Sequence, residues 1–286
     1  VKKGEGKFKT THFAVIFDSA RKNFRNEIFK EYKANRAEAP DDLVPQFEYI
    51  RKAVEAFSLP SIEMQNYEAD DLIATYTKKA LERGDTVTIV SSDKDLMQLL
   101  QKGVRLYDPI KNKELGEKEV FDKFGVKPEQ VIDVQSLAGD STDNIPGVPG
   151  IGVKTAAELI NKYKNLDNLL KNAHQIKQNK RRQTLEENKD KALISRELVR
   201  LKNDINLNDD LSSFILKDLD KNKLYEFLRE MEFNRLLSQV ISYYGEPSKS
   251  NTAIIESTLT LTSLLHCRTR IYIDMNEIHF MERIAR

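Results

Sequence analysis

Tyr67-Glu68-Ala69-Asp70-Asp71-Leu72-Ile73 places three acidic residues at the start of a predicted helix. Its apolar residues recur at helical spacing, so Glu68 and Asp71 lie on one face of the helix, with Asp70 at the edge. Taken singly, each acid is an ordinary solvated residue of a first helical turn. Their chemistry therefore depends on which other acids the fold brings beside them.

Two predicted strands end in further acids. Residues 86–90 are β-branched and apolar, which favours a buried parallel strand, and Asp93 and Asp95 follow its carboxyl end. Residues 12–17 read as a second buried strand, which ends in Asp18. Open α/β sheets bind ligands at this edge, and carboxylates gathered there repel one another unless a cation compensates. Mg²⁺ or Mn²⁺ suits such a site of carboxylates and water.

The composition is that of an ordinary globular chain. Its 286 residues, 40% of them hydrophobic, are enough for one large or two ordinary domains. A single cysteine, Cys267, excludes a disulfide framework and a cysteine-based zinc site, and the four histidines have no zinc spacing. No membrane-spanning run or signal segment is found, so we expect no membrane partner and a cytoplasmic location.

The charges are segregated along the chain although they nearly cancel. Residues 21–36 carry six basic and two acidic side chains, and residues 171–202 carry ten basic and four acidic ones. A chain that separates an acidic cluster from basic surfaces is suited to hold cations and a polyanion together. Either basic segment alone also fits an ordinary salt-bridged helix face.

The segment 21–36 contains an expected amphipathic helix over residues 23–33, which presents Arg25, Lys33 and Arg36 to a phosphate backbone. Further helices are expected from the Pro40 region to Phe57 and over residues 68–82, 130–139, 155–163 and 221–233, with a short strand at 104–107. Near Gly125 strands give way to short helices, which predicts a domain boundary there.

A glycine-rich turn at residues 147–152 directly precedes the helix expected over 155–163. Such a turn offers free backbone N–H groups and a positive helix end to phosphate. The spacing is not that of the phosphate loop of nucleotide hydrolases, and no strand precedes it. Gly150-Ile151-Gly152 is instead typical of a helix-hairpin-helix, which holds the DNA backbone without reading its sequence. Asp140 and Asp143, three residues apart, come just before the turn.

In this order the motifs resemble the 5′ nuclease domain of bacterial DNA polymerase I, within the 5′ nuclease and flap endonuclease family. The resemblance runs from about Thr11 to about Tyr244 and implies an α/β, parallel-sheet, PIN-like core with a helical arch over residues 1–125. It implies a helix-hairpin-helix subdomain over 126–245 and leaves 246–286 as a tail of unknown order. The carriers are Val15-Ile16-Phe17-Asp18, Phe24-Arg25-Asn26-Glu27, Tyr32-Lys33-Ala34-Asn35-Arg36, Glu68-Ala69-Asp70-Asp71, Ser92-Asp93-Lys94-Asp95, and the segment 139–156.

The resemblance also implies a role for each motif. The implied metal ligands are Asp18, Glu68, Asp70, Asp71, Asp93 and Asp95 in the core, with Asp140 and Asp143 at an outer site. The implied catalytic cations are Arg25, Lys33 and Arg36 of the arch, and Lys33 is the one expected at the scissile phosphate. The implied DNA-binding residues are Gly147, Gly150, Gly152, Lys154 and Thr155, at a turn that in the family also holds a monovalent cation such as K⁺. Tyr32, on the exposed arch, is expected to stack on a base.

The implied reaction is hydrolysis of DNA that carries a 5′ end or a 5′ flap, with Mg²⁺ or Mn²⁺, in replication and repair. We expect a bacterial monomer that works beside a separate polymerase polypeptide. One departure concerns the N-terminal side, where the family has a further strand and a metal-binding aspartate. Only seventeen residues precede Asp18, and none is an aspartate. We therefore expect a truncated or split product whose catalysis suffers more than its DNA binding.

Three other functions stay open at this point. The first is a non-catalytic, structure-selective DNA-binding remnant. The second is an aspartyl-phosphate phosphatase, since Asp93-Lys94-Asp95 has the spacing, although the usual following turn is lacking and the hairpin turn is left unexplained. The third is a ribonuclease with a related metal core, because carboxylates and basic helices do not distinguish DNA from RNA.

Overall fold

The computed structural model describes residues 10–246 and 270–271. The chain divides into two compact units, and each of them is built from separate pieces of the sequence. Unit 1 consists of Val1–Phe17, Glu38–Ile62 and Asn208–Arg286, and unit 2 of Asp18–Ala37 and Glu63–Leu207. The boundary expected near Gly125 falls inside unit 2, so the domain division at that residue stays a prediction.

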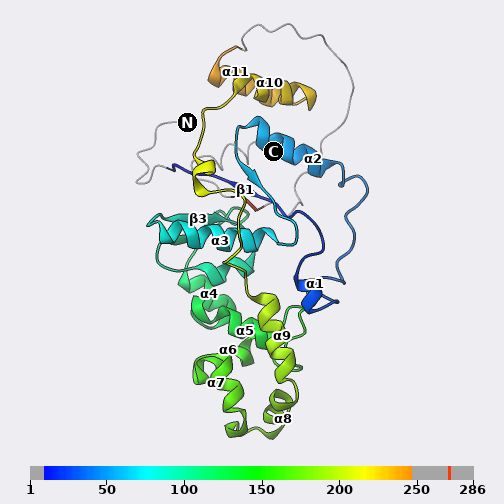
Figure 1. The fold of residues 1–286 in the computed structure, drawn as a ribbon, viewed down its shortest axis with the longest axis vertical. Helices are drawn as coiled ribbons and strands as arrows, with labels where there is room; N and C mark the ends of the chain where they lie inside the picture. The colour runs from blue at the N-terminus through cyan, green and yellow to red at the C-terminus, as the bar shows by residue number, and fades with distance from the viewer. Residues whose placement is uncertain (1–9, 247–269, 272–286) are drawn as a thin grey trace. The chain divides into compact units, whose positions relative to one another are not determined.

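The described part of unit 1 combines short strands with helices (Figure 1). β1 (Val15–Ile16) pairs in parallel with β2 (Ser61–Ile62) and antiparallel with β6 (Arg270–Ile271). α2 (Gln46–Ala56) packs against α10 (Lys221–Glu230), which packs against α11 (Asn234–Tyr244). The strand expected over 12–17 is shorter than predicted, the helix expected over 221–233 is confirmed as α10, which ends three residues earlier, and α11 was not predicted. The expected tail lies, apart from residues 246 and 270–271, outside the described residues.

The sheet of unit 2 carries the predicted strand. β3 (Val87–Val90) pairs in parallel with β4 (Val104–Asp108), and β4 pairs antiparallel with β5 (Lys113–Leu115). α3 (Ala69–Glu82) packs against β3 and buries the apolar positions read from the sequence. The predictions of a helix over 68–82 and a strand over 86–90 are therefore confirmed, whereas β5 was not predicted.

Helices make up the rest of unit 2. α5 (Val131–Ala138) packs against both α6 (Val153–Tyr163) and α9 (Lys189–Val199), as Figure 1 also shows. No strand occurs between residues 126 and 246, which confirms the predicted change of pattern. The sequence did not predict α4 (Glu117–Phe124), α7 (Leu166–Lys171) or α8 (Asn179–Glu187). Short 3₁₀ turns lie at η1 (Lys94–Leu99), η2 (Pro128–Gln130) and η3 (Ala173–Gln175).

None of the described helices has the length and apolar character that a membrane span requires.

The helix expected over 23–33 is wrong in its extent. Only α1 (Arg25–Ile28) is helical, and the chain then turns, with Lys33 in the left-handed region at φ 57°. The Lys33 N–H donates to the carbonyl of Asp143 at 2.9 Å, and Asn35 donates to the carbonyl of Ser141 at 2.7 Å. These bonds to a distant loop replace the helical ones, because a helix would direct the same groups along its own axis.

The loop from Gly139 to Gly147 closes on itself before α6. Asp140 and Ile145 exchange both backbone hydrogen bonds, at 3.0 and 2.8 Å. Gly147 has φ 58°, and a Cβ atom there would overlap the backbone of Gly139. Only glycine at this position combines the left-handed conformation with so close a backbone approach.

We predict that Gly147→Ala lowers the free energy of unfolding by about 3 kcal/mol, because it adds backbone strain and a steric overlap. Urea denaturation measures the change. Gly152→Ala is the matched control, since Gly152 has φ −87° and open space around its Cβ position. We expect the control to change the free energy of unfolding by less than about 0.5 kcal/mol. Equal losses in the two variants would contradict the packing argument.

Candidate functional site

The first turn of α3 gathers acidic side chains. Glu68 is its N-cap, and the Asp71 carboxylate accepts from the Glu68 N–H at 3.1 Å. The Asp18 carboxylate accepts from the Ala69 N–H at 2.7 Å, and Asp70 is buried in the same turn. Free N–H groups and the helix dipole stabilise negative charge here, which explains locally why the acids lie at this end of α3.

Cations lie directly on these acids. Arg25 forms a two-point ion pair with Asp71, with both N···O distances 2.7 Å. Lys33 pairs with Glu68, and its Nζ lies 3.7 Å from Asp143, which in turn pairs with Arg36. Lys33 therefore links the start of α3 to the 139–147 loop, and like charges within the cluster are compensated.

A second acidic group follows β3. Asp93 caps η1 by accepting from the Asp95 N–H at 2.9 Å, and Gln135 of α5 donates to Asp95 at 2.7 Å. Burial, together with the Asp93 charge, raises the pKa of Asp95 to about 6. Lys94 pairs with Asp140 of the 139–147 loop. Although burial opposes its ionisation, hydrogen bonds from Lys94 and Thr142 hold the pKa of Asp140 below its usual value.

Two of the predicted arch residues are not exposed. The Arg25 side chain is 1% exposed and Tyr32 is 4% exposed. The Tyr32 hydroxyl lies 3.2 Å from Glu68, and burial raises the pKa of that hydroxyl. The expectations that Arg25 meets a phosphate backbone and that Tyr32 stacks on a base are therefore wrong for this structure. The reason is that the arch segment folds inward onto α3 instead of forming an exposed helix.

The acids do not form the single metal cluster expected from the sequence. Among the described residues, no three His, Cys, Asp or Glu side chains converge on one point. The acids form two groups instead, one around Lys33 and one around Lys94. Their chemistry still fits a hard divalent cation, because every donor is a carboxylate oxygen. Burial and the neighbouring Asp93 charge raise the pKa of Asp95, so a nearby positive charge would stabilise its ionised form.

The glycine turn presents its outer half to solvent. Gly150 has φ 77°, Gly152 is the N-cap of α6, and a Cβ atom at either position would meet open space. Both glycines and Lys154 are exposed, and Thr155 is half-buried. The N–H groups of the first turn of α6 point toward this end of the helix. Gly147 is buried in the backbone contact with Gly139, so it shapes the turn without facing solvent.

Sequence reasoning missed three polar residues of the site. Asn23 donates to Glu68 at 2.9 Å, Gln135 donates to Asp95, and Lys94 pairs with Asp140. Lys94 could have been found, since it stands between two acids that require a counter-charge. Asn23 and Gln135 reach their partners from distant parts of the chain, so no local pattern marks them.

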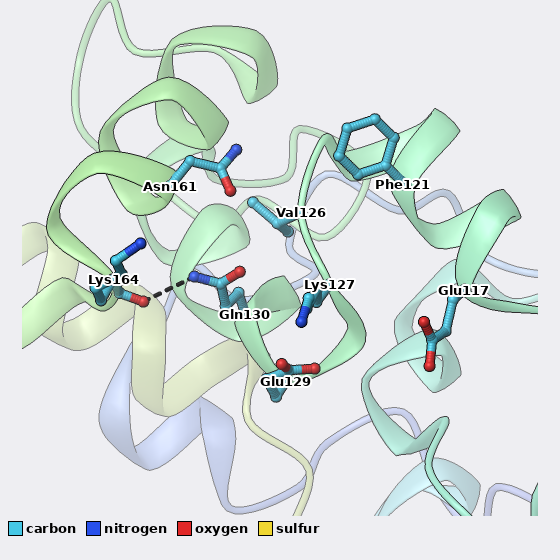
Figure 2. A pocket seen from close by; sticks show the side chains of 8 residues that line it. All are labelled: Glu117, Phe121, Val126, Lys127, Glu129, Gln130, Asn161 and Lys164. Carbon is cyan, nitrogen blue, oxygen red and sulfur yellow. Dashed lines mark hydrogen bonds between the residues drawn. The ribbon is translucent and has the colours of Figure 1, made fainter.

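A cavity of about 620 Å³ lies elsewhere in unit 2, beside α4, η2 and α6 (Figure 2). Its lining includes Phe121 of α4, Gln130 of η2 and Asn161 of α6. Gln130 donates to the carbonyl of Lys164 at 2.8 Å across one wall. None of the acids or arch cations described above lines this cavity, so the two features are separate.

Known proteins are similar to this chain in sequence. A 5′-3′ exonuclease of Buchnera aphidicola subsp. Acyrthosiphon pisum is 39% identical over 209 residues, which cover 71% of this chain and 73% of that protein. The chain belongs to the 5′-3′ exonuclease family. Its residues 3–125 match the N-terminal resolvase-like domain of 5′-3′ exonucleases, and residues 126–222 match their C-terminal SAM fold. The resemblance read from the motifs is confirmed.

Longer proteins contain the same region. DNA polymerase I of Rhizobium leguminosarum is 52% identical over 230 residues, which cover 80% of this chain and 23% of that protein. DNA polymerase I of Bacillus subtilis is 36% identical over 244 residues, or 27% of its length. This member of the 5′-3′ exonuclease family therefore spans about a quarter of the DNA polymerase I proteins that it matches.

Solved structures have the same fold. The T5 D15 protein, co-crystallised with metal ions, matches with a TM-score of 0.60 and 25% identity, over 79% of this chain and 85% of that one. The predicted PIN-like α/β core followed by a helical subdomain is thereby confirmed. A T5 5′-exonuclease structure of the same fold holds divalent zinc. A divalent metal is thus the class of cofactor that these neighbours support.

We predict that Asp95→Asn stabilises the metal-free chain at pH 7 by about 1–2 kcal/mol. Because the folded state raises the pKa of Asp95 to about 6, its ionised carboxylate costs stability fully above that pH. The cost disappears as the pH falls below the ordinary value of 3.8. Urea denaturation in EDTA between pH 4 and pH 8 measures this, and the advantage of the variant should vanish at the acid end. Asp122→Asn, on an exposed position of α4, is the control. A pH-independent effect would refute the desolvation argument.

Proposed function

We propose that this chain hydrolyses phosphodiester bonds in DNA that carries a 5′ end or a 5′ flap. The observation that supports this most is the placement of Lys33 and Arg36 on the acids Glu68 and Asp143. Backbone hydrogen bonds from the arch segment to the 139–147 loop fix both cations there. Phosphate-binding cations and metal-binding acids thus share one location, as phosphoryl chemistry requires.

The proposed cofactor is Mg²⁺ or Mn²⁺. We assign as its ligands the acids Asp18, Glu68, Asp70, Asp93, Asp95, Asp140 and Asp143. When bound, such ions lower the pKa of water and stabilise the oxygens of an in-line displacement. The metal ions held by the T5 D15 protein, which has the same fold, support the assignment.

The role of the chain's own cations follows from their present partners. In this structure Lys33 and Arg36 neutralise carboxylates. Each side chain can form the same kind of charge-assisted hydrogen bond with a DNA phosphate. A charge-assisted bond from Lys33 to the scissile phosphate stabilises the charge that develops on its oxygens. Arg36, which is more exposed than Lys33, suits the neighbouring phosphate. Arg25 has no such role, because it is buried.

The turn before α6 is the proposed grip on duplex DNA. Gly150 and Gly152 allow a phosphate to approach the backbone, and the N–H groups at the start of α6 supply donors. Lys154 and Thr155 add a charge and a hydroxyl at the same helix end. We also propose that this turn binds a K⁺ ion and that a polymerase polypeptide is a partner of the chain. The DNA polymerase I relatives, of which the matched region is only about a quarter, support the proposal of a polymerase partner.

The main alternative is a DNA-binding remnant without catalysis. The finding that favours it is that no three acidic side chains converge among the described residues. Cleavage of a 5′-labelled flap duplex with Mg²⁺ or Mn²⁺, with binding measured in parallel, separates the two. Cleavage that is abolished by Asp93→Ala/Asp95→Ala establishes the enzyme. Binding without cleavage establishes the remnant.

We predict that Lys33→Ala lowers the turnover of the flap duplex on the order of 10²–10³-fold, because the transition state loses its charge-assisted donor. DNA affinity should change less than threefold. Single-turnover cleavage and fluorescence anisotropy measure the two quantities. Lys118→Ala, on an exposed position of α4, should change neither. A Lys33→Ala variant that cleaves at the original rate would remove Lys33 from the mechanism.

We predict that Lys154→Ala weakens duplex binding uniformly across DNA sequences. The plot of log K against log salt should lose a slope of about 0.9, which corresponds to one phosphate contact. Binding titrations from 50 to 200 mM KCl measure the slope, with Lys118→Ala as the charge-matched control. An unchanged slope would place Lys154 outside the DNA interface.

A further inference from the structure

The ion pair between Arg25 and Asp71 is the most deeply buried charge pair described in unit 2. The two side chains are 1% and 0% exposed, and the two-point geometry has N···O distances of 2.7 Å. A charge buried so completely is tolerated only with a matched partner and full hydrogen bonding. Because Arg25 is buried, it does not face a DNA phosphate at the surface. Its pairing with Asp71 therefore has another role.

The carboxylate of Asp71 has no accepting capacity left. Its Oδ2 accepts from Arg25 Nη1 and from the Glu68 N–H at 3.1 Å. Its Oδ1 accepts from Arg25 Nη2 and from the Lys202 N–H at 2.9 Å. A carboxylate offers about four lone-pair sites, and four donors use them. A metal ion on Asp71 would have to displace a donor from a fully buried group.

Arg25 and its neighbours also hold the segment 198–202, which comprises the last two residues of α9 and the three residues after it. Arg25 donates to the carbonyls of Leu198 at 2.8 Å and Arg200 at 3.1 Å. Two further side chains hold other backbone groups of the segment. Gln98 donates to the carbonyl of Val199 at 3.0 Å and accepts from the Leu201 N–H at 3.1 Å, and Thr75 donates to the carbonyl of Lys202 at 3.2 Å. Side chains thus satisfy the last carbonyls of α9 and backbone groups of the irregular residues 200–202.

We propose that Arg25 and Asp71 form a clasp that fastens residues 198–202 to the start of α3, and that Asp71 is a positioning residue and not a metal ligand. It acts through the N–H of Glu68, whose carboxylate meets Lys33. The clasp itself stands on the geometry alone, whereas the positioning role rests on the proposed nuclease function.

The clasp connects two parts of unit 2 that the proposed reaction uses. Residues 198–202 include the end of α9, and α9 packs on α5, the helix before the glycine turn. Asp71 belongs to the acidic first turn of α3. The acids near the reacting phosphate and the helices near the duplex grip are therefore joined through one buried pair, which keeps their spacing constant.

A thermal unfolding cycle tests the clasp without any activity. Arg25→Met and Asp71→Asn should each lower Tm on the order of 10 °C, because each leaves an unmatched buried partner. The double variant should lose clearly less than the sum of the two shifts. Lys118→Met, Asp122→Asn and their double variant, on exposed positions of α4, should shift Tm by about 1 °C and add independently. Additive shifts at Arg25 and Asp71 would overturn the clasp.

Calorimetric titration with Mn²⁺ alone tests the assignment of Asp71. Asp71→Asn should keep Mn²⁺ affinity within about threefold at a temperature where it is folded, whereas Asp93→Asn should lose tenfold or more. In flap cleavage, Asp71→Asn should lower kcat with little change in the KM for DNA. Arg25→Met should also lower kcat, and the conservative Arg25→Lys should lower kcat less than Arg25→Met does. A tenfold loss of Mn²⁺ affinity in Asp71→Asn with an unchanged Tm would make Asp71 a ligand after all.

Milder variants decide the matter if Asp71→Asn does not fold. Arg25→Lys keeps the charge and loses the two-point geometry, and Thr75→Val removes the hydroxyl that lies within hydrogen-bond distance of the carbonyls of Asp71 and Lys202. Both should lower Tm measurably, and the absence of any shift in both would overturn the clasp. Failure of the wild-type chain to bind Mn²⁺ or cleave DNA would refute the proposed function. The unfolding cycle would still decide the clasp in that case.

Discussion

Buried negative charge is the constraint on which the site depends. Glu68, Asp71, Asp140 and Asp143 are nearly inaccessible to water, and each has a basic side chain on it. The basic segment before α2 is therefore not simply a phosphate-binding surface, because Arg25, Lys33 and Arg36 are the counter-charges of three of these acids. This explains why residues 29–36 lie as turns along the 139–147 loop and not as an exposed helix.

The same constraint connects stability with chemistry. An acid that is desolvated and crowded, such as Asp95, weakens the metal-free fold but is suited to attract a cation. Asp71, whose carboxylate already accepts four hydrogen bonds, makes the fold more rigid but has no free lone pair for a cation. Two aspartates of the same unit therefore differ in role because different numbers of hydrogen-bond donors surround them. Spacing alone does not reveal this difference.

Local patterns predicted α3, β3 and the positions of the acids at the start of α3 and after β3, because helical periodicity and β-branching are properties of neighbouring residues. They failed at Arg25, whose partners include the carbonyls of Leu198 and Arg200. They failed again over 29–36, because an amphipathic sequence pattern fits a helix and a series of turns equally well. The left-handed conformation of Lys33 is set by a bond to Asp143, more than a hundred residues away. Tertiary contacts of this kind carry no local signal.

The interleaved order of the two units has a consequence for synthesis on the ribosome. Every residue of unit 2 has been made once Leu207 is added, whereas unit 1 still lacks everything from Asn208 onward. Until then α2 has no partner for the apolar face that α10 later covers. The nascent chain therefore completes its catalytic candidate residues first and carries an open hydrophobic surface meanwhile. Such a surface is what chaperones recognise on emerging chains.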